Sequence, residues 1–230
     1  MASKRQTVLV LRTCSQDMTS RNNFRWPKRG RVEATDWRDD YRCGGGLHGL
    51  LWGVGDGEYL DWSADAKWLV VAVDQRDLRT GQGELTDKCK FCCGTVVYCG
   101  DRIGATSYLL RHGAAGMAVV GCISAAGDFG TATAGDRGTA TAGHGGTATA
   151  GHWGTATAGD GGTATAGHWG TATAGHCGTA TAGNRGAIVI RWWDCVRQRY
   201  RVAVGYVGED GIEPGKPYVV RDGKLARKET

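Results

Sequence analysis

The chain has 230 residues, a formal net charge of +5, 39 glycines and only three prolines. So many glycines favour several small units over one large core, and the few prolines with no Gly-X-Y period exclude a collagen. Basic residues are interspersed with acidic ones and form no dense run, which argues against a nucleic-acid-binding protein.

No apolar run reaches the roughly 18 residues that a membrane-spanning helix needs, so no contact with a membrane is expected. The first residues, MASKRQTVLVLRTCS, contain too short an apolar stretch for a signal peptide, and we expect synthesis in the cytoplasm. Nine cysteines are unusual for such a chain. Buried reduced thiols, a metal site and disulfides formed after release from the cell are three open explanations. The last would suit a phage virion released by lysis.

Residues 1–112 are expected to form an α+β head domain. Apolar, β-rich runs at 7–12, 67–74 and 95–99 predict strands. The segment 101–112 predicts a short helix that begins after Asp101 as its N-cap and ends at Gly113.

The head domain also holds the candidate disulfide or metal residues, which are Cys43, Cys89, Cys92, Cys93 and Cys99. Only one CxxC pair is present, whereas a zinc ribbon needs two, so disulfides or free thiols are favoured over zinc and no cofactor is expected. The chain contains no nucleophile elbow, phosphate loop or paired-carboxylate motif. We therefore expect no catalytic residues and no enzyme; an enzymatic or ligand-binding head would depend on His48.

An octapeptide, GTATAGxx, recurs in the middle of the chain, with TAT beginning at 131, 139, 147, 155, 163, 171 and 179. Two glycines and two β-branched threonines in every octad exclude a helix and leave short strands that turn at glycine. One octad is too short to circle a solenoid, so two octads per coil are expected. The variable pairs agree, because bulky pairs such as His152-Trp153 and His168-Trp169 recur every sixteen residues.

The repeat therefore predicts a short parallel β-solenoid of sixteen residues per coil over residues 113–186, in a mainly β chain. Side chains alternate along a strand, and we place alanine inward because inward threonine would bury unpartnered hydroxyls. The outward ladder comprises Thr131, Thr133, Thr139, Thr141, Thr147, Thr149, Thr155, Thr157, Thr163, Thr165, Thr171, Thr173, Thr179 and Thr181.

One edge of this solenoid is expected to carry a column of four large side chains, Arg137, Trp153, Trp169 and Arg185. Exposed tryptophans on consecutive coils predict a packing or subunit contact, with a ligand platform as the alternative. Histidines at the neighbouring positions could stack, but no third ligand converges on them, so solvated turn residues are favoured over a metal site.

Residues 187–230 are expected to form a small C-terminal β-hairpin cap. Two strand-like runs, AIVIRWW and RYRVAVGYVG, flank a polar connection, and Arg221-Asp222-Gly223-Lys224 is a hairpin turn signal. Such a cap would cover the open end of the solenoid, which otherwise invites aggregation.

The repeat resembles that of bacterial ice-nucleation proteins, A-G-Y-G-S-T-x-T. In Ala150–Thr157, AGHWGTAT, the first Ala and Gly and both threonines match, whereas the tyrosine is replaced by histidine. The segments 44–53, 67–74, 96–105 and 200–212 resemble regions around such repeats in uncharacterised bacterial and phage proteins. The resemblance implies a β-solenoid; no established activity follows from the flanks.

These features predict a non-enzymatic structural protein that associates with itself or with other structural subunits in a larger assembly, with a phage virion as the preferred setting. The principal alternative is an ice-binding protein that uses the outward threonines. A second alternative is an enzyme or ligand-binding head around His48.

Overall fold

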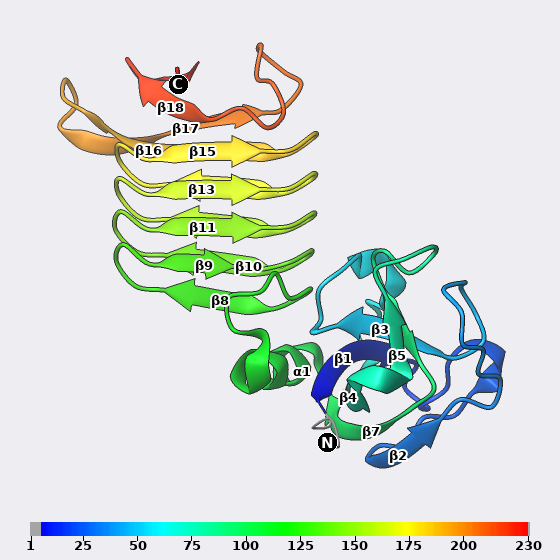
Figure 1. Ribbon diagram of the computed structural model, residues 1–230. Coiled ribbons are helices and arrows are strands. Elements are labelled where there is room, and N and C mark those ends of the chain that lie inside the picture. Colours follow the sequence, from blue (N-terminus) through cyan, green and yellow to red (C-terminus); the bar gives the residue numbers. More distant parts are fainter. Residues whose placement is uncertain (1–5, 230) are drawn as a thin grey trace. The chain divides into compact units, whose positions relative to one another are not determined.

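The computed structural model describes residues 6–229. Residues 1–5, which belong to the segment from which no signal peptide is expected, and Thr230 lie outside the described residues. The chain divides into two compact units, Met1–Val120 and Gly121–Thr230 (Figure 1).

The first unit is built on an antiparallel seven-stranded sheet with the strand order β2-β7-β4-β1-β3-β6-β5. Its strands are β1 (Thr7–Cys14), β2 (Gly30–Glu33), β3 (Leu47–Leu51), β4 (Lys67–Asp74), β5 (Leu78–Thr80), β6 (Cys89–Phe91) and β7 (Cys93–Gly100). Three short 3-10 helices lie at Arg21–Asn23, Gly57–Tyr59 and Gln75–Asp77. The strands predicted at 7–12, 67–74 and 95–99 are confirmed, two of them with longer bounds.

The predicted helix is present as α1 (Arg102–Leu109), followed by a π-helical turn over Leu110–Ala114. The Asp101 carboxylate accepts a hydrogen bond from the Gly104 N–H at 2.7 Å, so it caps the helix as expected. Gly113 has a φ of 124°, a conformation that glycine adopts at low cost, and the helical backbone ends there.

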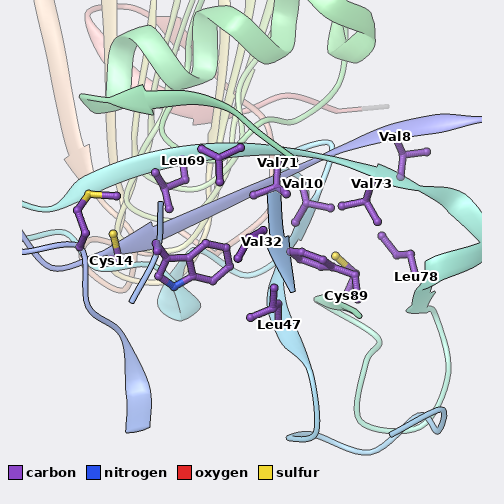
Figure 2. Close-up of a cluster of buried hydrophobic side chains, with 14 residues drawn as sticks. Val8, Val10, Cys14, Val32, Leu47, Leu69, Val71, Val73, Leu78 and Cys89 are labelled. Atoms are coloured by element: carbon purple, nitrogen blue, oxygen red, sulfur yellow. The ribbon is translucent and has the colours of Figure 1, made fainter. Parts of the chain in front are cut away.

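One buried hydrophobic cluster of the first unit lies on one face of this sheet (Figure 2). Figure 2 shows Val10 of β1, Leu69 and Val71 of β4 and Leu47 of β3 pointing into one cluster. Consecutive apolar residues in β1 and β4 are buried on both sides, which is why these two strands read as unbroken apolar runs in the sequence.

The second unit is the predicted solenoid, and two six-stranded sheets form its sides. One sheet has the order β17-β16-β14-β12-β10-β8 and the other has the order β19-β18-β15-β13-β11-β9. The repeat strands are β8 (Ile123–Ala126), β9 (Thr131–Thr133), β10 (Thr139–Ala142), β11 (Thr147–Ala150), β12 (Thr155–Ala158), β13 (Thr163–Ala166), β14 (Thr171–Ala174) and β15 (Thr179–Ala182). Consecutive octads alternate between the sheets, so each coil contains two octads and sixteen residues, as the repeat predicted (Figure 1).

Parallel pairing keeps equivalent residues in register from coil to coil. Thr155 pairs with Thr171 and Ala156 with Ala172, sixteen residues further along. Both alanines of each TATA strand are buried between the sheets, while the threonines alternate outward, so the assignment of alanine inward is confirmed.

The corner positions require glycine because the neighbouring atoms leave no room for a Cβ. A Cβ on Gly159 would lie 2.7 Å from the backbone carbon of Gly143 in the preceding coil, and one on Gly154 would lie 2.8 Å from the Ala150 Cβ. Because backbone atoms cannot move aside without shifting the next coil, larger residues are excluded at these positions.

At the C-terminal end, β16 (Ala187–Asp194) pairs in parallel with β14, and β17 (Arg199–Tyr206) pairs antiparallel with β16. Ile188 and Ile190 extend the inward alanine columns and are fully buried, so larger side chains close this end of the core. The hairpin of β18 (Tyr218–Arg221) and β19 (Lys224–Arg227) continues the other sheet. Its turn residues Asp222 and Gly223 have φ values of 51° and 77°, as the turn sequence predicted.

Among the described residues, no helix has both the length and the apolar character that crossing a membrane requires.

The thin alanine core predicts that one inward side chain cannot be enlarged. We expect Ala156→Leu to lower the free energy of unfolding of the solenoid by about 2 kcal/mol, because a fully buried methyl between two sheets leaves no room for extra carbons. Urea unfolding followed by circular dichroism measures this. Thr141→Leu, an exposed outward position in the neighbouring strand, is the control; equal loss in both variants would contradict the packing argument.

Candidate functional site

The four residues of the predicted interaction edge lie in one column along the second unit. The Trp153 and Trp169 rings stack with centroids 4.9 Å apart and an interplanar angle of 1°. The Arg137 guanidinium carbon is 5.9 Å from the Trp153 ring centroid, and that of Arg185 is 4.7 Å from the Trp169 ring centroid. The order along the column is therefore cation, aromatic, aromatic, cation, and both ends are cation–π contacts.

The local backbone explains why these side chains project outward. Each belongs to a four-residue turn, closed in the Trp153 turn by a hydrogen bond of 3.2 Å from the Gly154 N–H to the Gly151 carbonyl oxygen. Trp153 and Trp169 are the third residues of their turns, with φ values of 56° and 58°. This left-handed conformation costs a residue with a Cβ about 1–2 kcal/mol relative to glycine. The tryptophans occupy it while 53% and 45% of their surface is exposed.

The second column of turns shows what this position holds elsewhere. Its third residues are Phe129, Gly145, Gly161 and Cys177, and all have positive φ. Glycine at two of these four positions is the unstrained choice, and its absence from the tryptophan column means that large side chains are retained there against the backbone preference.

The histidines beside the tryptophans stack as well. The ring centroids of His152 and His168 are 4.8 Å apart, at an interplanar angle of 25°. In the other column, Asp160 lies between His144 and His176 and accepts a hydrogen bond from the His176 N–H at 2.7 Å. Neither arrangement brings three metal-ligating atoms together among the described residues.

The threonine ladder forms two arrays, one on each sheet. The first comprises the outward threonines of β10, β12 and β14, and the second those of β9, β11, β13 and β15. Within the described residues, the Thr179 hydroxyl is the one ladder hydroxyl with a hydrogen-bond contact to another side chain, the Lys228 ammonium at 3.3 Å. The other ladder threonines are exposed or half-buried.

The cysteines do not form the predicted disulfides, because all nine are unpaired in the structure. The Sγ atoms of Cys92 and Cys93 are 3.6 Å apart, well beyond the roughly 2.05 Å of an S–S bond. Cys43 is exposed, Cys89 is buried, and the Cys99 Sγ lies 3.8 Å from the Met18 sulfur. Cys43, Cys89 and Cys99 are not part of the cluster that contains Cys92 and Cys93.

One group of potential metal ligands is found among the described residues: Asp77, Cys92 and Cys93, whose ligand atoms lie within 4.8 Å of one another. Burial raises the pKa of Cys93 to about 11, with Cys92 and Asp77 adding to the effect, so this thiol is protonated near neutral pH. Sequence reasoning missed Asp77, which lies in the 3-10 helix before β5 and has no spacing relation to a cysteine motif.

His48 of β3 lines a cavity of about 880 Å³ in the first unit, so the ligand-sized pocket on which the second alternative depended exists. The His48 ring also contacts the backbone of one loop. Nε2 accepts a hydrogen bond from the Gly44 N–H at 3.3 Å, and the ring also pairs with the Gly46 backbone. His48 therefore helps to hold a glycine loop beside the cavity.

A buried lysine holds the same loop from the other side. Lys90 of β6 has a fully buried side chain, and its ammonium forms an ion pair with Asp40 and donates to the Arg42 and Gly44 carbonyl oxygens at 3.0 and 3.3 Å. This contact lowers the pKa of the Asp40 carboxyl. Lys90 was not predicted; a charged residue at an inward position between Cys89 and Phe91 was the available signal.

The environment of His48 predicts an acid-sensitive first unit. Burial, and then the nearby cations Lys88 and Arg12, lower the pKa of His48 from 6.5 to about 4. Because the unfolded chain takes up a proton below pH 6.5 and the folded chain does not, stability is fully present above pH 6.5 and is lost as the pH falls towards 4.

Thermal unfolding of the full chain at pH 7 and pH 5 measures this effect, and we expect a lower unfolding temperature of the first unit at pH 5. His48→Gln, which keeps an amide donor and acceptor but cannot titrate, is expected to show a smaller difference between the two pH values. An unchanged pH dependence in this variant would contradict the assignment.

Comparison with known proteins adds a family model and several relatives. Residues 8–111, less than half of the chain, match the model described as "Domain of unknown function (DUF7666)". An ice nucleation protein of Pseudomonas syringae is 40% identical over 101 residues, 44% of this chain and 9% of that protein. An ice nucleation protein of Xanthomonas campestris pv. translucens is 37% identical over 109 residues, 46% of this chain and 7% of that protein. No solved structure matches.

A further relative, ice nucleation protein InaU of Pantoea ananas, is 34% identical over 109 residues, 47% of this chain and 10% of that protein. This chain thus spans about a tenth or less of the length of these relatives. The predicted resemblance is confirmed: the chain carries an octapeptide β-solenoid similar to that of bacterial ice nucleation proteins, together with a segment that matches a domain of unknown function.

Proposed function

We propose that this chain is a non-enzymatic structural protein whose solenoid associates with a second copy of itself through the column Arg137, Trp153, Trp169 and Arg185. The repeat fold and its relatives support a structural repeat module, and no enzyme family is indicated. The observation that carries the proposal is the stacked tryptophan pair, which is held in a strained conformation with about half of its surface exposed.

Energetic considerations favour a contact at this column. Two adjacent tryptophans expose a flat apolar surface to water, and burying such a side chain contributes about 2 kcal/mol or more. The arginines at either end lie over the outer ring faces of the same chain, which gives the column a polar rim around an aromatic centre. Protein interfaces have this anatomy.

The symmetry of the column favours a second copy as the partner. The order Arg, Trp, Trp, Arg reads the same from both ends. A two-fold axis between Trp153 and Trp169 would place each of them against the other tryptophan of the second copy. Closed dimers form through such self-complementary patches.

Sedimentation velocity of the full chain over a concentration series tests this proposal. We expect a dimer whose dissociation constant rises at least about tenfold in the double variant Trp153→Ala, Trp169→Ala, because the central aromatic contact is lost. Phe129→Ala removes an exposed aromatic residue with the same positive φ from the other column and is the matched control. A wild-type chain that is monomeric throughout, or an equal effect of Phe129→Ala, would overturn the proposal.

Attachment within a larger assembly, with a phage virion as its setting after synthesis in the cytoplasm, is the wider form of the proposal. Disulfides formed after lysis were one reason to prefer a virion, and the unpaired cysteines do not support that reason. The resemblance of the flanks to phage repeat proteins is the remaining support. We propose no resident cofactor; a zinc titration of this chain would address Asp77, Cys92 and Cys93 first.

Ice binding is the second candidate function. The specific observation in its favour is the pair of threonine arrays, in which equivalent threonines pair in register and strands are spaced by about 4.8 Å from coil to coil. The relatives named ice nucleation protein are about ten times longer than the segment they share with this chain, and arrays of three and four strands are small faces.

Droplet-freezing and thermal-hysteresis assays test ice binding. If the first array contacts ice, the pair Thr155→Tyr, Thr171→Tyr in β12 and β14 abolishes the effect of the wild type, because the phenol rings break the flat array. The pair Thr147→Tyr, Thr163→Tyr makes the same change on the other sheet and shows which array is used. A wild-type chain without activity at high concentration eliminates this candidate.

A further inference from the structure

The cavity of the first unit carries an inference that is independent of the solenoid. Its volume of about 880 Å³ lies in the range of small-molecule sites. The residues that line it include Arg12, Gly44, Gly45, His48, Tyr59 and Lys88. They come from β1, from the loop before β3 and from the segments before β4 and β6, so a small number of fixed elements surround the space.

Arg12 is a half-buried cation without an anionic partner. Its Nε donates to the Thr13 carbonyl oxygen at 3.0 Å and its Nη1 to the His48 carbonyl oxygen at 2.9 Å, and the guanidinium lies 4.4 Å from the Trp26 ring centroid. No carboxylate pairs with it, and Nη2 makes no hydrogen bond to any residue that the structure describes. Burial lowers the pKa of Arg12 to about 10, so the cation lacks compensation.

Lys88 is a second lining cation that pairs with no carboxylate of the described residues. Its ammonium is 3.2 Å from the Cys43 Sγ and 4.3 Å from the Tyr59 ring centroid. Other cations of this unit do form ion pairs with acids, such as Arg76 with Asp74 and Arg79 with Asp39. Within the part of the chain that the structure describes, Arg12 and Lys88 form none.

The lining as a whole is positive. Four basic residues, Arg12, Arg21, Arg25 and Lys88, face two acidic residues, Asp36 and Glu58, which gives a formal charge of +2. His48 adds no charge near neutral pH, because its pKa is about 4. A concave site with excess positive charge raises the local concentration of anions.

The loop that forms one wall is held in a fixed shape. Lys90 and His48 bind its backbone from two sides, and Gly44, Gly45 and Gly46 all have positive φ. Glycines bring backbone rather than side chains to the cavity, and a fixed wall lowers the entropy lost when a ligand binds.

We propose that this cavity binds a small organic anion, with a phosphate or carboxylate group held between Arg12 Nη2 and Lys88 Nζ. Charge-assisted hydrogen bonds from both cations replace the missing carboxylate partners. The apolar lining residues Phe24, Leu47 and Leu60 contact the uncharged part of the ligand. The cavity lies within the segment that matches a domain of unknown function, so this binding would give that segment a role apart from the solenoid.

Isothermal titration calorimetry of the full chain with pyrophosphate and with citrate tests the proposal and separates the two anion chemistries. We expect one-to-one binding of at least one probe. Arg12→Gln and Lys88→Gln are each expected to weaken it at least about tenfold, because each removes a charge-assisted contact. Lys88→Gln matters most, since among the described residues the Lys88 ammonium contacts the Cys43 and Tyr59 side chains and no backbone group.

Arg29→Gln, which removes an exposed charge outside the lining, is the matched control and is expected to leave the affinity within about threefold. The double variant Trp153→Ala, Trp169→Ala should bind the probe unchanged, which separates this proposal from self-association. Absence of binding of both probes, no effect of Lys88→Gln, or an equal loss in Arg29→Gln would overturn it.

Discussion

The hydrogen-bonded register between residues sixteen apart is the constraint on which the second unit depends. Each strand pairs with the strand one coil away, and the turns pair too, as in the bond of 2.8 Å from the Trp153 N–H to the His168 carbonyl oxygen. Because strands and corners repeat at the same spacing, every side-chain column follows from the backbone. The alanine core, the threonine arrays and the aromatic column all repeat once per coil for this reason.

This periodicity is why the solenoid could be predicted from the sequence and the first unit only in part. The alternation of Thr and Ala in the repeat predicts which residues point inward and which outward. The stacking of Trp153 on Trp169 follows from the sixteen-residue length of the coil. In the first unit, strands such as Lys67–Asp74 were readable as apolar runs, and the Asp101 cap as a local signal. Strand order and loop shape depend on contacts distant in sequence, which no local pattern encodes.

The side chains that shape the cavity show the same limit. Lys90 is separated by 50 residues from its ion-pair partner Asp40, and Arg12 by 36 residues from the carbonyl oxygen of His48. His48 was singled out as a residue for chemistry; in the structure it lines the cavity and its Nε2 accepts a hydrogen bond from the Gly44 N–H. The cysteines show this too: their number allowed disulfides as one explanation, but all nine are unpaired and they are distributed over both units.

The turns of the solenoid have a consequence for how such a protein can diverge. The third turn residue has positive φ whether it is Arg137, Gly145, Trp169 or Cys177, so the turn keeps one backbone conformation with different side chains. Glycine corners and inward alanines, by contrast, are fixed by contacts with the neighbouring coils. Duplication of octads could therefore lengthen the solenoid while substitution at two sites per coil alters what its edges recognise, leaving folding and recognition to evolve separately.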